Sequence, residues 1–229
     1  MQTIGQNIRN IEKNKDAVAM KVGRKPGEVL LVVVTKTRNE EEINRAIENG
    51  ITDIGENRVQ EILDKFDKVK PVRWHLIGHL QTNKVKYIID KVSLIHSVDS
   101  LKLANEIDKR AGQLGKEMDI LIQVNAAEEE SKFGITVEET GPLIKDILNT
   151  CKYIRIKGLM SIAPFAENPE DIRIYFRQVK KLYDDFSLIN HERLDFQYLS
   201  MGMSHDYEVA IEEGSNLIRV GSAIFGPRS

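Results

Sequence analysis

The chain has 229 residues, enough for one large domain or two small ones, and 41% of them are hydrophobic, which is usual for a soluble globular protein. Its 33 basic and 35 acidic residues give a net charge of -2, which argues against a dedicated nucleic-acid binder. No apolar run reaches the about 18 residues that a membrane span needs, so we expect neither nucleic acid nor a membrane as a partner.

The amino-terminal segment predicts a helix, because Ile4, Ile8, Ile11 and Val18 fall on one helical face. It does not combine a basic start with an apolar core, as a secretory signal would, so we expect a cytoplasmic protein. The single cysteine, Cys151, cannot form an internal disulfide, which suits a reducing compartment. We expect it to be a buried or half-buried thiol without a role.

Short apolar runs then alternate with longer amphipathic segments. The first is LLVVV at residues 30–34, and seven more follow at residues 51–55, 72–78, 92–98, 118–124, 154–160, 194–200 and 216–221. Near-continuous apolar strands, each followed by a helix or helical turn, are typical of parallel β/α units. The sequence therefore predicts one domain over residues 1–229, a (β/α)8 barrel with an extra amino-terminal helix. A doubly wound open sheet is the alternative.

Three of the intervening helices have clear signals. Residues 40–50 end at Gly50, and residues 100–115 begin with Ser100 as the amino-terminal cap and end at Gly115. Residues 170–189 contain a stripe with helical spacing, which predicts a buried face. The members of this stripe are Ile172, Phe176, Val179, Tyr183 and Phe186.

Lys36 follows the first strand after Thr35. In a barrel, the working groups lie at the carboxyl ends of the strands, where a charged ammonium is costly unless it is paired or reacts. Desolvation lowers the pKa of a lysine in general, and the free amine can attack a carbonyl group and hold it as a Schiff base. The alternative is that Lys36 only extends to solvent at the end of the strand.

A serine and a glycine lie close together at the end of each of the last two strands. The seventh run ends at Ser200, which Met201 and Gly202 follow, and the eighth ends at Gly221, which Ser222 follows. Glycine lets backbone N–H groups approach an anion closely, and barrels often bind phosphate after strands seven and eight. These two pairs predict a phosphate site, although such pairs also occur in plain turns.

Arg219 shares one face of its strand with Leu217, so it points into the barrel mouth if the other face packs against helices. There it must meet an acceptor or an anion; a structural ion pair with Glu208 or another carboxylate is the alternative.

Other polar residues follow the second, third and fourth strands. Asn57 and His79 are predicted to line the site, while His96 either joins them or is a satisfied core histidine. His75 and His79 have the spacing of metal ligands on a helix, but Gly78 and the strand pattern argue against a helix there. We expect no metal, because no other metal-binding motif is present.

Seven segments along the chain, in their order and spacing, resemble the pyridoxal phosphate homeostasis protein family, which is related to the amino-terminal barrel of alanine racemase. The resemblance covers essentially the whole chain. Its segments are VTKT at 34–37, the Gly-Glu-Asn turn at 55–57, HLIGHLQTNK at 75–84, KFGI at 132–135, GLMSIAP at 158–164, LSMGMSHD at 199–206 and IRVGSAIFG at 218–226.

The resemblance implies that pyridoxal 5′-phosphate (PLP) is the cofactor, held as an internal aldimine on Lys36. It implies Ser200, Gly221 and Ser222 on the phosphate and Arg219 near the pyridine nitrogen. Further lining residues are implied at Asn57, His79, Met160, Ser161, Met201 and Gly202.

Three functions fit this reading. The first is a PLP-binding protein of vitamin B6 homeostasis, a monomer that delivers PLP to PLP-dependent apoenzymes. The second is a PLP enzyme such as an amino-acid racemase, although the chain ends at Ser229 and leaves no room for the second domain that supplies a racemase's other base. The third is an aldolase-like enzyme that uses a lysine Schiff base without PLP.

Overall fold

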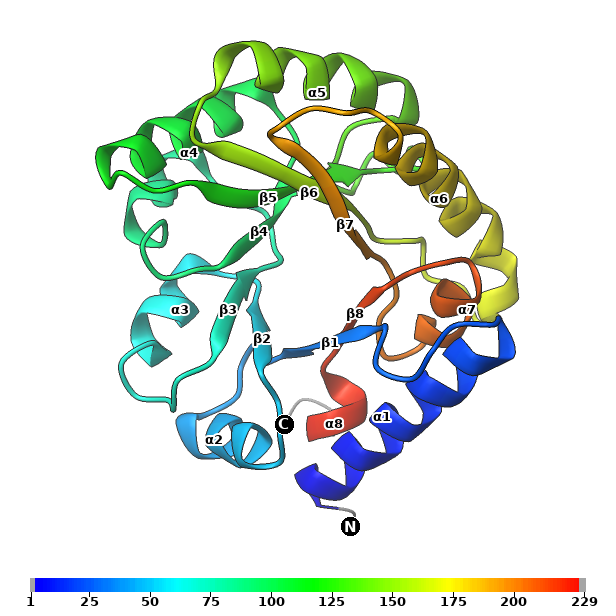
Figure 1. Ribbon diagram of the computed structural model, residues 1–229. Coiled ribbons are helices and arrows are strands. Elements are labelled where there is room, and N and C mark those ends of the chain that lie inside the picture. The colour runs from blue at the N-terminus through cyan, green and yellow to red at the C-terminus, as the bar shows by residue number, and fades with distance from the viewer. Residues whose placement is uncertain (1–2, 227–229) are drawn as a thin grey trace.

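Eight parallel strands form a closed barrel in the order β1 to β8, with helices around the outside (Figure 1). The computed structural model describes residues 3–226. The strands are β1 Leu30–Val34, β2 Asp53–Glu56, β3 Arg73–Leu76, β4 Leu94–Val98, β5 Met118–Val124, β6 Ile154–Ser161, β7 Leu194–Ser200 and β8 Leu217–Val220. Pairing of β1 with β8 closes the barrel, so the predicted (β/α)8 fold is confirmed and the open sheet is excluded.

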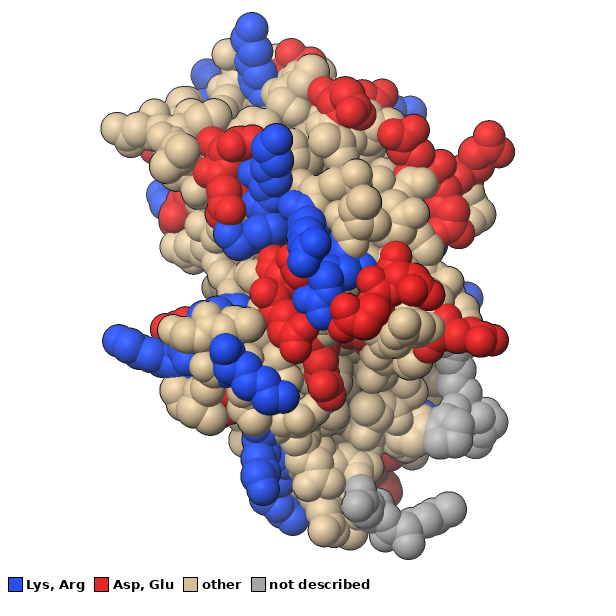
Figure 2. All heavy atoms as spheres, turned by 90° about the vertical axis from the view of Figure 1, so that its right-hand side faces the viewer, with Lys and Arg blue, Asp and Glu red and all other residues tan. Residues whose placement is uncertain are grey.

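The helices follow the strands, except that α1 precedes β1 and packs against α2, α7 and α8. Figure 2 shows the side of the molecule that carries α6 and α7, where acidic and basic side chains lie next to one another. The helices are α1 Ile4–Lys21, α2 Glu40–Glu48, α3 Val59–Lys65, α4 Leu101–Gln113, α5 Val137–Thr150, α6 Arg173–Ser187, α7 Tyr207–Glu212 and α8 Ser222–Phe225, with 3-10 turns η1 Thr82–Tyr87 and η2 Pro169–Ile172. No helix within residues 3–226 is long and apolar enough to cross a membrane.

The helix ends follow local chemistry that the sequence predicts. The side chain of Ser100 accepts a hydrogen bond from the backbone N–H of Leu103 at the start of α4, which satisfies one of the free donors there. Gly50 and Gly115 follow α2 and α4 with φ angles of +94° and +62°. Both angles lie in the left-handed region that glycine adopts readily, so each residue ends its helix as predicted.

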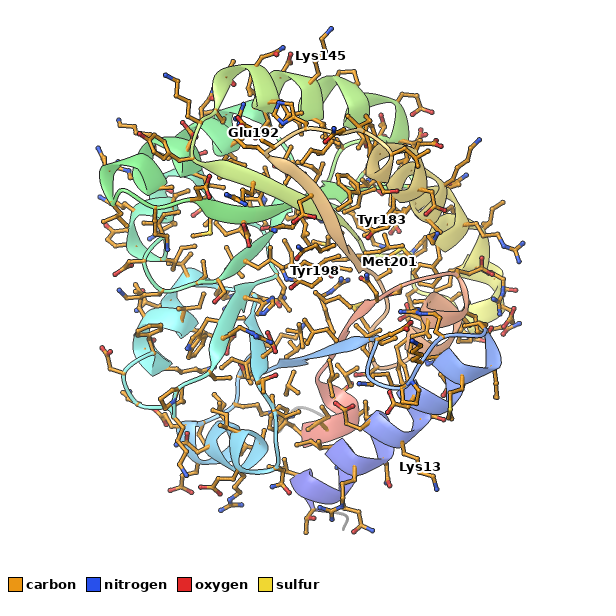
Figure 3. All side chains as sticks on the ribbon, viewed as in Figure 1. Lys13, Lys145, Tyr183, Glu192, Tyr198 and Met201 are labelled. Atoms are coloured by element: carbon orange, nitrogen blue, oxygen red, sulfur yellow. The ribbon has the colours of Figure 1, made fainter. Side chains whose placement is uncertain are left out.

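The strands separate two hydrophobic layers because alternate side chains point to opposite sides. Leu31 and Val33 of β1 belong to the outer layer, which packs against the helices. A smaller cluster fills the barrel; its members are Val32, Leu94, Leu121, Met160 and Leu217. Figure 3 shows Tyr198 of β7 pointing into the barrel, whereas Lys13 and Lys145 point away from the helices. The barrel is therefore a packed core, and in such barrels the working groups lie at the carboxyl ends of the strands.

Candidate functional site

Lys36 lies in the turn that follows β1, at the carboxyl-terminal end of the barrel. Its position continues the alternation of Val32, which faces the barrel interior, and its side chain is partly buried. Thr35 before it is fully buried, and Thr37 after it has a φ angle of +64°, which is unusual for a residue other than glycine. The backbone on both sides of the lysine is thus tightly specified.

A buried ion-pair cluster of α3 and β2 holds both neighbours of this lysine. The Lys65 ammonium donates to the carbonyl oxygen of Thr35 at 3.0 Å, to Glu56 Oε1 at 2.7 Å and to Glu61 Oε2 at 2.8 Å. The Thr35 hydroxyl donates to Glu56 Oε1 at 2.7 Å, and the Thr37 N–H donates to Glu61 Oε2 at 2.7 Å. We call Glu56, Glu61 and Lys65 the clamp.

The two carboxylates of the clamp differ in their environment. Burial raises the pKa of Glu56, whose Oε2 has no hydrogen-bond partner within residues 3–226. Burial also acts to raise the pKa of Glu61, but hydrogen bonds from Lys65 and the Thr37 N–H outweigh it and lower that pKa. The clamp is therefore held mainly by the Lys65 charge that lies between the two carboxylates.

Arg219 of β8 is buried in the barrel on the same side as Leu217, as its strand pattern predicts. Its Nη1 donates to the Ser200 carbonyl at 2.8 Å and to the Ser200 hydroxyl at 2.5 Å, and its Nη2 donates to the Ser161 carbonyl at 2.9 Å. Within residues 3–226 it makes no ion pair with a carboxylate, and Glu208 bonds to Asn14 instead. Burial lowers the pKa of Arg219 to about 10, so the guanidinium stays charged at neutral pH.

A chain of buried hydrogen bonds continues from Ser200 across the barrel. The Ser200 hydroxyl lies 3.0 Å from His96 Nδ1, His96 Nε2 lies 2.9 Å from His75 Nδ1, and His75 Nε2 lies 2.9 Å from Asp53 Oδ1. Asp53 begins β2, so the chain reaches the amino-terminal end of the barrel. There the exposed Arg73 binds both oxygens of Asp53, at 2.7 and 2.6 Å. We call Asp53, His75, His96, Ser200 and Arg219 the polar chain.

The ionisation of its ends gives this chain a direction. Burial acts to raise the pKa of Asp53, but hydrogen bonds from His75, Arg73 and Thr52 outweigh it, so the pKa lies well below its ordinary value. Burial, together with the nearby His75 and Arg219, lowers the pKa of His96 well below the ordinary value and keeps it neutral. Arg219 can only donate and the ionised Asp53 can only accept, so the two ends of the chain differ in their hydrogen-bonding role. His96 is a satisfied core histidine that also supports a candidate site residue.

The glycines after β7 and β8 allow close backbone packing. A Cβ atom on Gly202 would lie 2.7 Å from Ala210 Cβ, and its φ angle is +91°, so only glycine fits there. A Cβ atom on Gly221 would lie 3.1 Å from the Val34 carbonyl oxygen. The Ser204 hydroxyl accepts long hydrogen bonds from the N–H groups of Gly221 and Ala223, at 3.3 and 3.4 Å.

Asn57 and His79 lie together in a surface hollow of about 430 Å³ beside the barrel mouth. The His79 ring stacks on Phe133, with ring centroids 3.8 Å apart and an interplanar angle of 13°. Phe133 comes from the loop between β5 and α5, within the KFGI segment at 132–135. His75 lies in β3, so the predicted absence of a helix at this pair of histidines is confirmed.

The remaining predicted residues divide between the two layers. Met160 is buried in the cluster inside the barrel, and the Ser161 hydroxyl donates to the Val124 carbonyl at 2.8 Å. The Met201 side chain packs in the outer layer, and Ser222 is exposed at the start of α8. No group of three or more metal-binding side chains occurs in the described part of the chain.

Sequence reasoning did not identify Ser204, the clamp or the Asp53–His75 end of the polar chain. Ser204 had a signal, because it lies in the same glycine-containing segment as Ser200. His75 had a weaker one, a histidine inside an otherwise apolar strand. Glu61 and Lys65 of the clamp look like ordinary surface charges of a helix, and only the tertiary fold shows that Lys65 is 8% exposed and lies against Glu56 of β2.

Comparisons with known proteins agree in covering nearly the whole chain. The family described as "Alanine racemase, N-terminal domain" matches residues 6–229. A pyridoxal phosphate homeostasis protein from Aquifex aeolicus is 44% identical over 210 residues, covering 91% of each chain. One from Helicobacter pylori is 38% identical over 227 residues, covering 98% of this chain and 97% of that protein. The solved structure of PipY from Synechococcus elongatus with PLP bound is 31% identical, with a TM-score of 0.79, and covers 93% of this chain and all of that one.

Proposed function

Since the chain belongs to the pyridoxal phosphate homeostasis protein family, within the wider family of the alanine racemase N-terminal domain, we propose that it binds PLP and acts in PLP supply rather than in a reaction of its own. The observation that carries this proposal is that one barrel has Lys36 directly after β1 and the charged, buried Arg219 in the neighbouring strand β8. A relative with PLP bound supports it.

Lys36 is the proposed covalent anchor. Its amine attacks the aldehyde carbon of PLP, water leaves, and a Schiff base joins the two. The clamp supports this role because it fixes Thr35 and Thr37, and so limits where the lysine stem can start.

Arg219 is the proposed partner of the pyridine nitrogen. PLP when bound supplies an electron sink, and a protonated ring nitrogen strengthens that sink. A guanidinium that stays charged can only donate a hydrogen bond, so it leaves the ring nitrogen unprotonated. This arrangement favours binding and exchange of PLP over carbanion chemistry, and it disfavours the racemase alternative.

The phosphate group is proposed to lie against Gly202, Gly221 and Ser222. The N–H groups of Gly221 and Ala223, which donate to the Ser204 hydroxyl at long distances, are suitable donors for an anion. Ser200 stays a predicted phosphate contact, with the added fact that its hydroxyl is bonded to Arg219 and His96. We propose Asn57, His79, Met160, Ser161 and Met201 as further lining residues.

The first test is the visible absorption spectrum of the purified protein after addition of PLP, before and after borohydride reduction. We expect a band that borohydride removes, with the modified peptide containing Lys36. The Lys36→Ala variant should lack the band, and Lys13→Ala, altered at a lysine that points away from α1, should keep it (Figure 3). If the Lys36→Ala variant kept a band that borohydride removes, the covalent role of Lys36 would be contradicted.

A second test separates supply from catalysis. The PLP-loaded protein is mixed with amino acids in heavy water, and exchange of the α-proton is followed by NMR. We expect exchange no faster than with free PLP, whereas clear acceleration would favour the racemase alternative. Transfer of PLP to a PLP-dependent apoenzyme, measured as recovered enzyme activity, tests the proposed recipient.

A further inference from the structure

The wall of the hollow beside the barrel mouth contains basic side chains but no acidic ones. Its lining includes Arg58 and Lys84 but no carboxylate. Four other surface hollows of the molecule each contain at least one carboxylate in their walls. These carboxylates include Glu12, Asp90, Glu117 and Glu192.

The two cations of this wall are not neutralised by neighbours. Neither Arg58 nor Lys84 forms an ion pair with any residue between 3 and 226, and both are exposed. The Lys84 ammonium lies 5.7 Å from the centre of the Tyr87 ring, which is a cation–π contact. Their positive charge is therefore directed at the hollow or at solvent.

Two carboxylates near the hollow contact other lining residues. Asp99 faces His79 at 3.9 Å, and Asp64 accepts a hydrogen bond from Gln60 at 2.8 Å. Neither lies in the wall of the hollow, so the net charge that an entering group meets is positive.

We propose that this hollow binds the carboxylate or phosphate group of a small organic anion. Arg58 and Lys84 are the charged donors, while the side-chain amides of Asn57 and Gln81 complete the polar wall. Leu63 and the half-exposed Tyr87 ring supply an apolar surface for the rest of the ligand. The volume of about 430 Å³ lies within the range of known small-molecule sites.

The place of this site beside the mouth follows from shared residues. Asn57 and His79 belong both to the wall of the hollow and to the predicted lining of the mouth. A ligand in the hollow is thus a neighbour of whatever occupies the barrel mouth, yet its charged donors are separate from Lys36 and Arg219. The inference does not depend on PLP binding and is tested without PLP.

The experiment is a titration of the full-length, isotope-labelled protein with inorganic phosphate and, separately, with acetate, at constant ionic strength. NMR follows the amide signals of Arg58, Gln81 and Lys84 and the Arg58 side-chain N–H. We expect saturable shifts with at least one anion; phosphate alone indicates a phosphate-bearing ligand, and acetate alone a carboxylate. Shifts that stay linear with both anions, or that saturate only at Gly221 and Ser222, would overturn the proposal.

The variants separate a built site from diffuse charge. Arg58→Gln combined with Lys84→Gln should weaken the saturable binding by about 10-fold or more, because charge-assisted hydrogen bonds are lost. The matched control is Lys86→Gln, which removes a cation that lies 4.8 Å from the same Tyr87 ring but lines the neighbouring hollow. An equal loss in Lys86→Gln would show that only diffuse charge acts and would reject the site. All three residues are exposed, and well-dispersed spectra confirm folding of the variants.

Discussion

At the scale of single residues, the turn that carries Lys36 is held by charges that burial makes interdependent. Lys65 is 8% exposed and Glu56 is fully buried, so neither charge can be solvated if the other is removed. The pair is weak evidence for high stability, because desolvation opposes its attraction. It is strong evidence for a fixed backbone, since the same two side chains also bind Thr35.

Replacing Lys65 by Ala should destabilise the protein strongly. We expect the free energy of unfolding, measured with urea, to fall by about 3–5 kcal/mol, because Glu56 is left as a buried uncompensated carboxylate. The control is Lys68→Ala, which breaks a pair with Glu40 whose side chains are 59% and 38% exposed. Its expected loss is below about 1 kcal/mol. Equal losses in the two variants would contradict the clamp.

The sequence could identify a residue when its position relative to a strand was unusual, but not when its importance depends on a distant contact. Lys36 follows an apolar strand and Arg219 lies within one, and alternation alone indicates the side of the strand on which each lies. Lys65 pairs with Glu61 four positions away on α3, a common surface pattern that gives no sign of burial. Its contact with Thr35 joins residues 30 positions apart, and only the fold brings these together.

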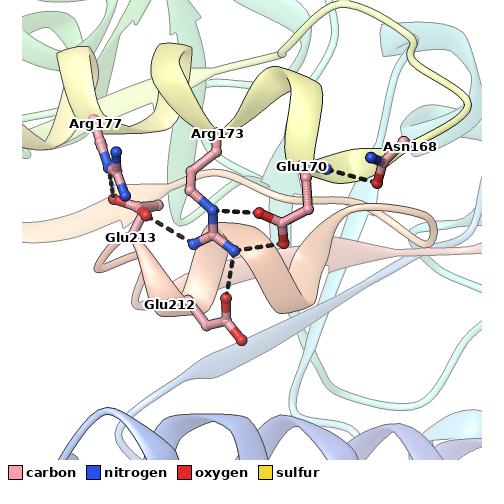
Figure 4. Close-up of polar contacts among 6 residues, drawn as sticks. All are labelled: Asn168, Glu170, Arg173, Arg177, Glu212 and Glu213. Atoms are coloured by element: carbon pink, nitrogen blue, oxygen red, sulfur yellow. Dashed lines mark hydrogen bonds and ion pairs between the residues drawn. The ribbon is translucent and has the colours of Figure 1, made fainter.

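At the scale of elements, two arginines of α6 bind the carboxylates at the end of α7, and Arg173 makes most of these contacts. Arg173 donates to Glu170 at 2.7 and 2.6 Å, to Glu212 at 2.6 Å and to Glu213 at 2.7 Å, and Arg177 also binds Glu213 (Figure 4). The carboxylates raise the pKa of Arg173, with the Glu170 hydrogen bond as the largest cause. One side chain thus links the start of α6 to the end of α7.

The Arg173→Ala variant should lose about 1 kcal/mol of unfolding free energy, since a network exceeds a single exposed pair but stays partly solvated. The loss should shrink when the measurement is repeated at high salt, because salt screens exposed charges. Arg155→Ala serves as the control, because Arg155 and Glu117 form a single pair with side chains 42% and 44% exposed. A salt-independent loss would show that packing, rather than charge, joins the two helices.

The limits of several elements were predictable because their signals are local. The apolar runs at 30–34, 118–124 and 194–200 coincide with β1, β5 and β7. The segment at 170–189 is not one continuous α-helix. It begins in the 3-10 turn η2, and α6 starts only at Arg173. Pro169 lies in the first turn of η2, where it lacks an N–H to donate, and the apolar stripe gives no information about this change of helix type.

At the scale of the whole molecule, acid stability should depend on the polar chain. The folded pKa of Asp53 lies well below its ordinary value of about 3.9, so its contribution to stability is fully present above that ordinary value and is lost progressively as the pH falls from there toward the folded pKa. The neutral, buried His96 adds a loss below about pH 6.5, where the unfolded chain binds a proton that the folded chain does not. Stability should therefore decline from neutral to acid pH.

The Asp53→Asn variant tests this dependence. We expect about 3 kcal/mol less unfolding free energy at pH 7, because the Arg73 and His75 contacts lose their charged partner. We also expect a smaller further loss between pH 5 and pH 3 than in the unaltered protein, as measured by urea unfolding at each pH. Asp146→Asn, on the exposed side of α5, should leave the pH dependence unchanged. An equally steep dependence in Asp53→Asn would contradict the assignment.

Closure of the barrel was the part of the fold that local patterns left open. Local signals give β/α units, and both a barrel and an open sheet satisfy them. The decision rests on the pairing of β1 with β8, where Val32 lies opposite Arg219 across nearly the whole chain length. The same closure brings Asp53, His75, His96 and Ser200 from four strands into one line, so the polar chain could not be predicted before the barrel itself.

The polar chain also changes how freely this scaffold could be altered. In barrels of this kind, the loops at one rim are usually exchanged to change chemistry, while the opposite rim is left to maintain stability. Here Asp53 and Arg73 lie at the rim that is usually left alone, and two histidines connect them by hydrogen bonds to the serine that contacts Arg219 of the candidate site. The two rims are not independent modules, so a redesign of the far one is also a redesign of the site.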